Sequence, residues 1–410
     1  MIDLCNEKSE IIREGLAKIC VPRRDLYLRK NGVYEPSWAP VFYNPVMAMN
    51  RDMTILAINI LSESSRIKSA SDLMAATGVR GIRIALECPS IEEVYLNDID
   101  PVSCRYIEKN IMINSVRNKI RLFCEDFGSL ARSLVKSGVK IDFNDVDPYG
   151  SPALYVSPAI DLTRRDGFIS FTATDIGSLS GTYPHKSLKR YEAHVIKTDF
   201  SREVGLRVLI GYIARRASEK NYGIKPIIAY YSDHYYKVIT RISRGSEKAL
   251  ETLKKTGFYR YCRSCGYRDH IYFEDLIDLR IDRNCPVCGS KLSLIGPLWL
   301  GDLWDKEFIE KAIDYAEKKI PLENRDKAMR ILSRIKRESS IETPYYYTTD
   351  HIASRVKTFS PPLNKLMECV RSRGYYIERT HFDDKGLRTN APFRDLIECI
   401  KETSGENRSS

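Results

Sequence analysis

One stretch of the sequence combines an acidic residue, a proline and an aromatic residue. Asp147, Pro148 and Tyr149 directly follow the candidate strand Ile141–Val146. This trio suits methylation of an exocyclic amine on a nucleic-acid base, whose nitrogen lone pair is delocalised into the ring. A carboxylate that accepts the N–H bonds localises the lone pair, proline stiffens the turn, and the aromatic ring stacks on the base. The alternative is an ordinary Asp-Pro turn with a purely structural role.

Three earlier segments carry residues suited to binding a nucleotide-like cofactor. Ala76–Gly81 is a glycine-bearing turn that opens a helix, where the backbone can approach a ligand and the helix N-terminus favours anionic groups. Asp98 lies 20 residues after Gly78, the offset at which nucleotide-binding sheets place the acid that holds ribose hydroxyls. Asp126 ends the next candidate strand, beside the expected adenine position. A helix N-cap is the alternative role for Asp126, and it is compatible with ligand contact.

The scaffold that would position these residues is an α/β sheet. From about residue 67 to 240, short β-rich runs alternate with amphipathic helical stretches, which favours a doubly wound parallel sheet. Ligands bind outside the carboxyl ends of the strands in such sheets, so the residues above would meet at one edge. Residues 226–231 and 236–242 are expected to add an antiparallel hairpin. The candidate strands are Ser71–Ala75, Val94–Asn97, Ile120–Cys124, Ile141–Val146 and Phe168–Thr172.

Four of the 11 cysteines form two Cys-x2-Cys pairs separated by 19 residues, which matches the spacing of four-cysteine zinc sites. A glycine follows each pair and permits a tight turn around a metal. With four thiolates and no open position, the predicted zinc is structural, one per chain. The predicted ligands are Cys262, Cys265, Cys285 and Cys288.

The remaining cysteines are scattered, and we expect them to be buried small hydrophobes and not a disulfide framework. They are Cys5, Cys20, Cys88, Cys104, Cys124, Cys369 and Cys399.

No stretch reaches the ~18 uncharged apolar residues that a membrane span needs. The N-terminal sequence lacks the basic-then-apolar order of a signal peptide, so a cytoplasmic location is expected.

The length of 410 residues predicts two or three domains, and 43% hydrophobic residues exclude a largely disordered chain. The net charge of +11 is uneven, because residues 161–260 hold 19 Lys and Arg against 10 Asp and Glu. Such an excess suits a polyanion such as nucleic acid, although a solvated basic surface has the same composition. The residues expected to contact phosphates are Lys186, Lys189, Arg190, Lys197, Arg215 and Arg216.

Several strings closely resemble the tRNA (guanine-26-N2)-dimethyltransferases, the Trm1 family, of archaeal type. The most specific combination is Asp147-Pro148-Tyr149-Gly150-Ser151-Pro152 with Asn44-Pro45 and Asn50-Arg51-Asp52. The further matching strings are Ala76–Arg83, Asn97–Ile99, Thr172–Asp175, Ala229–Tyr235 and Gly296–Trp299.

The resemblance implies a class I S-adenosylmethionine-dependent methyltransferase fold that donates one or two methyl groups to the N2 amine of guanine 26 in tRNA. Asp147 would be the catalytic carboxylate, with Pro148 and Tyr149 beside it. By position, the cofactor-binding residues would be Arg51 and Arg83 at the methionine carboxylate, with Arg80 as a second candidate there, Thr77 and Gly78 in the turn, Asp98 at the ribose, and Asp126 and Phe127 at the adenine.

The implied domains are an N-terminal extension packed on the catalytic domain (1–66), the methyltransferase domain (67–258), the zinc knuckle (259–296), a helical, winged-helix-like α+β domain that binds tRNA (297–401), and a disordered tail (402–410). A DNA amino-methyltransferase and a non-catalytic zinc-ribbon RNA-binding protein are the rival functions. The family strings argue against the first, and three acids in one pocket argue against the second. No obligate protein partner is indicated.

Overall fold

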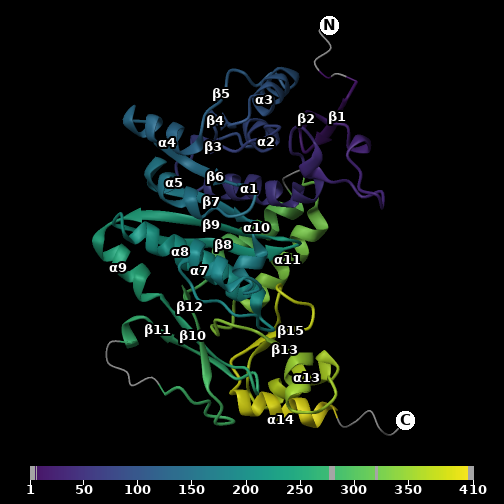
Figure 1. The fold of residues 1–410 in the computed structure, drawn as a ribbon, viewed down its shortest axis with the longest axis vertical. Coiled ribbons are helices and arrows are strands. Elements are labelled where there is room, and N and C mark those ends of the chain that lie inside the picture. Colours follow the sequence, from purple (N-terminus) through teal and green to yellow (C-terminus); the bar gives the residue numbers. More distant parts are fainter. Residues whose placement is uncertain (1–4, 6, 277–281, 319–321, 405–410) are drawn as a thin grey trace. The chain divides into compact units, whose positions relative to one another are not determined.

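A computed structural model describes residues 5, 7–276, 282–318 and 322–404 of the chain. Its elements form two compact units, each assembled from several segments of the sequence (Figure 1). None of the described helices combines the length and the apolar composition that crossing a membrane requires. Unit 1 comprises Met1–Thr172, Ile239–Ile242 and Glu310–Arg330, and unit 2 comprises Ala173–Val238, Ser243–Ile309 and Ile331–Ser410.

The predicted doubly wound sheet is present, with seven strands in the described part of the chain. They are β3 (Ser69–Asp72), β4 (Glu93–Asn97), β5 (Ile120–Phe123), β6 (Ile141–Val146), β7 (Thr163–Ala173), β8 (Tyr222–Ser232) and β9 (Tyr235–Arg244). The order is β5-β4-β3-β6-β7-β9-β8, and the pairs from β5 to β7 are parallel. The chain runs outward from β3 in both directions, as is typical of doubly wound folds. Only two residues join β8 to β9, which confirms the predicted antiparallel hairpin.

Strand β6 shows how the sheet accommodates polar residues in its interior. All six residues are buried, including Asp142, Asn144 and Asp145. Asp142 accepts two backbone N–H bonds at the start of β3, at 2.7 and 3.1 Å. Asn144 accepts a bond from the Ser71 hydroxyl at 2.6 Å, and Asp145 lies 3.0 Å from the Arg80 guanidinium. Because each buried polar group has a partner, β6 remains in the sheet interior and presents the next acid at its edge.

The helices of unit 1 begin where the sequence supplies caps. Pro101 occupies the first turn of its helix, and Asp100 accepts two backbone N–H bonds there. An antiparallel hairpin near the N-terminus was not predicted. The elements are β1 (Ser9–Glu14), β2 (Ala17–Pro22), α1 (Ala48–Leu61), α2 (Val79–Glu87), α3 (Pro101–Ile113), α4 (Phe127–Lys136) and α5 (Val156–Leu162), with 3-10 turns η1 (Arg24–Leu26), η2 (Pro36–Trp38), η3 (Pro45–Met47) and η4 (Ala153–Tyr155).

Unit 2 contains two small antiparallel sheets, ordered β11-β10-β12 and β13-β15-β14. Two helices, α10 (Lys306–Lys318) and α11 (Arg325–Glu338), contain residues of both units. The other elements are α6 (Ile176–Leu179), α7 (Pro184–Tyr191), α8 (Ser201–Ser218), α9 (Ser246–Lys254), β10 (Thr256–Cys262), β11 (Arg268–Tyr272), η5 (Glu274–Leu276), β12 (Leu292–Trp299), β13 (Tyr347–Thr348), α12 (Thr349–Arg355), α13 (Leu363–Ser372), β14 (Ile377–Arg379), β15 (Gly386–Thr389) and α14 (Phe393–Ser404).

The C-terminal segment of unit 2 has its own apolar core. Leu366 and Val370 of α13 pack in one buried cluster with Leu387 of β15 and Leu396 of α14. Helix α13 and the hairpin β14–β15 belong to this core, in the region for which the sequence predicts a winged-helix-like domain. Helix α14 was not predicted, and it continues to Ser404, so residues 402–404 of the predicted disordered tail are helical. Residues 405–410 of that tail lie outside the described residues.

The expectation for the scattered cysteines is wrong for six of the seven. The disulfides are Cys5–Cys20, Cys104–Cys124 and Cys369–Cys399, with Cα–Cα distances of 6.0, 6.0 and 5.7 Å, within the range for disulfides. Of the seven scattered cysteines, Cys88 alone is free and buried, as expected. The partners lie 15 to 30 residues apart, so the fold, and not a local motif, brings them together.

Candidate functional site

The glycine-bearing turn after β3 is tightly packed against α3. Gly78 has φ of +77°, in the left-handed region that favours glycine, and a Cβ there would lie 3.2 Å from the Ile107 side chain. Thr77 Oγ1 is buried and has no hydrogen-bond partner among the described residues. Asp98, at the end of β4, holds the turn by accepting the Ala76 N–H at 2.8 Å. The turn is therefore fixed, and it retains a buried hydroxyl group for a ligand.

Asp126 lies at the end of the third parallel strand along the chain and caps the following helix. It accepts the Ser129 N–H at 2.9 Å, and hydrogen bonding from Ser129 holds the pKa of this exposed carboxyl below its usual value. Phe127 is buried and meets the Tyr155 ring edge-on, with centroids 5.1 Å apart. The cap and its exposed carboxylate coexist, as the sequence suggested.

Asp147 is held by a buried arginine. Arg80 ion-pairs with Asp147 Oδ2 and lies 3.0 Å from Asp145. It also donates to Asn50 at 2.9 Å and to Thr54 at 3.0 Å. The side chain of Asp147 is 17% exposed, whereas that of Asp145 is fully buried. Arg80 therefore holds the Asp147 carboxylate, which is the one of the two that faces solvent.

Two exposed aromatic rings lie beside this carboxylate's turn. Tyr149 is 84% exposed and Phe42 is 39% exposed, and their ring centroids are 6.2 Å apart with the planes at 75°. An exposed aromatic ring beside a carboxylate offers a face on which a planar base could stack. The sequence interpretation included Tyr149 but missed Phe42, because the contact joins segments about 100 residues apart.

The arginines predicted at the methionine carboxylate are committed to acidic partners. Arg51 makes two hydrogen bonds to Glu14, both at 2.6 Å. Arg83 is fully buried and pairs with Glu14 at 3.0 Å, Asp52 at 2.8 Å and Glu87 at 2.9 Å. Burial raises the pKa of Glu14, but the two guanidinium groups outweigh it and lower that pKa to about 2. This packing favours a structural role for Arg83, which acts on Arg51 through Glu14.

The sequence analysis missed one acid at the ligand edge, the edge of the sheet formed by the carboxyl ends of the parallel strands. Asp72 is the last residue of β3, it is 3% exposed, and burial raises its pKa to about 7, against the lowering effect of Arg80. The predicted strand Ser71–Ala75 placed this residue inside the strand and not at its end. A strand end three residues earlier would have grouped Asp72 with Asp98 and Asp147.

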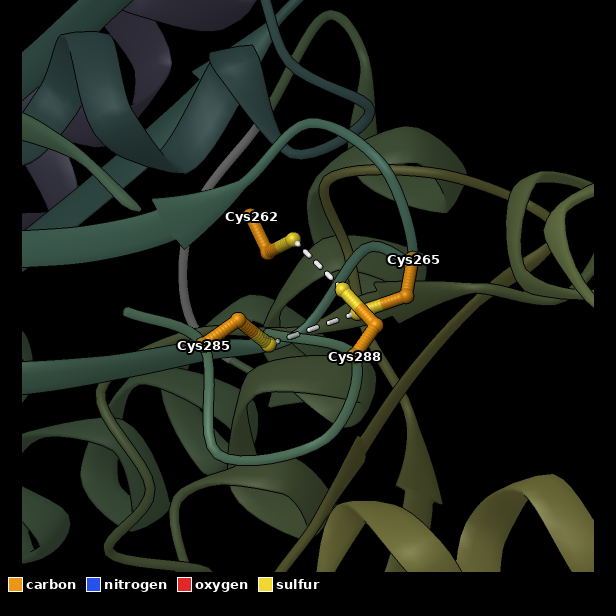
Figure 2. Close-up of side chains that lie close together, drawn as sticks. All are labelled: Cys262, Cys265, Cys285 and Cys288. Atoms are coloured by element: carbon orange, nitrogen blue, oxygen red, sulfur yellow. Dashed lines mark hydrogen bonds between the residues drawn. The ribbon is translucent and has the colours of Figure 1, made fainter. Parts of the chain in front are cut away.

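The four grouped cysteines converge in unit 2 (Figure 2). Two sulfur–sulfur distances are 3.5 and 3.6 Å, and all four sulfurs lie within 4.8 Å of one another. Tetrahedral zinc with Zn–S bonds of about 2.3 Å requires sulfurs about 3.8 Å apart, so the donor set fits this metal. The glycine after each pair has positive φ, as the wrapping turns require. The four residues are Cys262, Cys265, Cys285 and Cys288.

Hydrogen bonds prepare one of these thiols for metal binding. The hydroxyl and backbone N–H of Ser290 lower the pKa of Cys288 to about 6. His270, which lies between the two cysteine pairs in the sequence, does not join the cluster. The cluster therefore consists of four cysteine side chains, and burial raises the pKa of Cys265 and of Cys285, in contrast to that of Cys288.

Of the six basic residues predicted to contact phosphates, three have carboxylate partners. Arg190 lies 3.1 Å from Asp175, and Arg215 and Arg216 lie 3.8 and 3.1 Å from Glu192. Within the described residues, the structure gives no carboxylate partner to Lys186, Lys189 or Lys197.

Comparison with known proteins gives a consistent result. Residues 17–401 match the family described as N2,N2-dimethylguanosine tRNA methyltransferase. A tRNA (guanine(26)-N(2))-dimethyltransferase of Metallosphaera sedula is 36% identical over 98% of this chain and 99% of its own length. One of Sulfurisphaera tokodaii is 35% identical over 95% of this chain and 98% of its own length. Trm1 from Pyrococcus horikoshii, solved with S-adenosyl-L-methionine, is 32% identical with a TM-score of 0.82, covering 95% of this chain and 99% of that one.

Proposed function

Since this chain belongs to the N2,N2-dimethylguanosine tRNA methyltransferase family, we propose that it transfers one or two methyl groups from S-adenosylmethionine to the N2 amine of guanine 26 in tRNA. The observation that carries this is Asp147, held by buried Arg80 at the end of β6 beside exposed Tyr149. The family match favours tRNA over DNA and an enzyme over a binding protein. A tRNA substrate also favours the cytoplasm as the site of action.

The donor would bind at the carboxyl ends of β3, β4 and β5. When bound, S-adenosylmethionine supplies the electrophilic methyl group. Thr77 Oγ1 would gain its missing hydrogen-bond partner, and Gly78 would let the backbone approach the donor. Asp98 would accept from the ribose hydroxyls, and Asp126 with Phe127 would border the adenine. These assignments use the residues that the parallel strands bring to one edge.

The methionine carboxylate of the donor would need a cation that is not already paired with several acids. Arg83 has no exposed side-chain surface and three acidic partners, whereas Arg51 is slightly exposed and has one. Arg51 is therefore our candidate for the methionine carboxylate. Arg83 would position it through Glu14, and Arg80 would position Asp147.

The target guanine must leave the tRNA stack to reach the carboxylate. Arg80 binds Oδ2 of Asp147, which leaves Oδ1 to accept an N–H of the guanine amine. Tyr149 would stack on the base, and Phe42 meets the Tyr149 ring edge-on, at an interplanar angle of 75°. As the bond from the amine nitrogen to the methyl carbon forms and the donor's sulfur–methyl bond breaks, positive charge would grow on nitrogen, and the Asp147 carboxylate would stabilise it more in the transition state than in the ground state. The amine proton would then pass to Oδ1 of Asp147, and S-adenosylhomocysteine would leave.

Asp147 can act twice on the same nitrogen. The unmodified amine has two hydrogens, and the monomethylated amine keeps one. The carboxylate accepts that remaining N–H, provided the pocket admits the first methyl group, and the second proton then leaves in the same way. Dimethylation thus needs no second catalytic group.

We also propose one structural zinc held by the four cysteines. The support is the sulfur geometry, which fits tetrahedral zinc held by four cysteines. Its function would be to fix the loops that join β10 to β11 and lead into β12.

The proposed activity is tested by incubating the protein with labelled donor and unmodified tRNA transcripts. Digestion should release N2-methylguanosine and N2,N2-dimethylguanosine from position 26. A transcript with adenine at position 26 should remain unlabelled. Label in another nucleoside, or no label in any tRNA, would contradict the proposal.

A further inference from the structure

Unit 2 contains a cavity of about 440 Å³ that the donor site does not use. Three of its lining residues are cations: Lys197, Arg263 and Arg355. Arg263 lies in the turn between Cys262 and Cys265, and Arg355 ends helix α12. The cavity therefore adjoins the cysteine cluster, and its size falls in the range of ligand pockets.

The positive charge of this cavity is uncompensated. Lys197, Arg263 and Arg355 are exposed, and within the residues that the structure describes none has a carboxylate partner. The acid in the lining, Asp199, is already neutralised, because the Arg268 guanidinium lies 2.8 Å from Oδ1 and 3.0 Å from Oδ2. A cavity with three free cations and one paired acid attracts an anion.

The wall around Asp199 is rigid. Arg268 is fully buried, with its guanidinium carbon 4.1 Å from the Phe200 ring centroid and 4.6 Å from that of Tyr347. Thr348 donates its hydroxyl to Asp199 at 3.0 Å. Because this wall is already held by its contacts, it loses little conformational freedom when an anion binds to the cavity.

We propose that this cavity binds a backbone phosphate of the tRNA. Two guanidinium groups offer planar pairs of N–H donors that match phosphate oxygens, and a lysine adds a point charge. The volume leaves room for the sugar next to the phosphate. The identity of the ligand as tRNA rests on the proposed function, whereas the anion site itself rests on the charges. The cysteine cluster would then serve substrate binding, because it fixes the turn that carries Arg263.

The test measures tRNA affinity against salt concentration for Arg263→Ala, Arg355→Ala and the double variant. The matched control is Arg244→Ala, an exposed arginine at the end of β9 and outside the cavity. Each cavity substitution should reduce the slope of log K against log salt by roughly 0.7–0.9, and the double variant by about twice that. The methylated guanine should not change, because phosphate contacts position the tRNA without reading sequence.

Two further measurements separate the outcomes. S-adenosylhomocysteine should stabilise every variant as it does the wild type, which shows that the variants fold. An unchanged salt slope in the double variant, with wild-type methylation intact, overturns the phosphate site alone. A reduced slope without any methylation by wild type overturns the proposed function alone. Stabilisation of wild type by inorganic phosphate, lost in the double variant while the tRNA slope is unchanged, would assign the cavity to a free anion and contradict the tRNA contact.

Discussion

At the scale of single residues, the acids of the ligand edge differ in their partners. Asp145 and Asp147 share the Arg80 guanidinium, whereas burial raises the pKa of Asp72 to about 7. A carboxyl whose pKa is raised in the folded state binds a proton there that the unfolded chain releases. Between pH 4 and 7, the free energy of unfolding contributed by Asp72 therefore falls as the pH rises.

Asp72→Asn should remove this pH dependence. The pKa difference between 3.8 and about 7 corresponds to roughly 4 kcal/mol at pH 8. We expect the variant to gain stability relative to wild type at pH 8 and to gain little at pH 4. Urea unfolding at both pH values, with Asp302→Asn as an exposed control, measures the difference. Equal changes at both pH values would contradict the assignment.

The same residues show what the sequence could predict. The rule that ligands gather at strand ends located Asp98, Asp126 and Asp147 from spacing alone. Asp72 was missed because its strand ends three residues earlier than the apolar pattern indicated. The partner of Arg80 and the ring beside Tyr149 depend on contacts between distant segments, which no local pattern records.

At the scale of elements, the cysteine cluster should depend on its metal for order. We expect about one zinc per chain, and Cys285→Ser should lose most of it. The substitution should loosen β10 and β12 in hydrogen exchange while donor binding remains nearly intact, because metal binding is coupled to folding of this segment. Cys88→Ser, which removes the free buried thiol, should keep the metal. Chelator-washed wild-type protein without zinc would refute the site.

Helix α14 could have been predicted from the sequence. Phe393, Leu396 and Ile400 recur at helical spacing, and all three are buried on the face that packs on α13. The hairpin β1–β2 is different, because the alternation of apolar residues in its strands is weak. Its pairing is visible only in the folded structure.

At the scale of the whole molecule, three disulfides close loops of 15, 20 and 30 residues. Loops of this size stabilise a fold by about 3 kcal/mol each through the unfolded chain. Sequence spacing could not distinguish these cysteines from buried thiols, since each pair joins different elements.

Alkylation of denatured, metal-free protein should label five cysteines without reductant and eleven after reduction. Reduction should also lower the thermal midpoint of the zinc-loaded protein by several degrees, since each bond contributes about 3 kcal/mol. Eleven labelled cysteines without reductant would show that the disulfides do not form in the isolated protein.

The central claim is that the Asp147 carboxylate drives methyl transfer to guanine 26. Single-turnover methylation of unmodified tRNA by Asp147→Asn tests it most directly, because asparagine keeps the shape and removes the charge. The rate should fall roughly 10²–10⁴-fold, the range typical of a positioned acid–base group, while donor and tRNA affinities change little. A single-turnover rate within a few-fold of wild type would reduce Asp147 to a turn residue and contradict the mechanism.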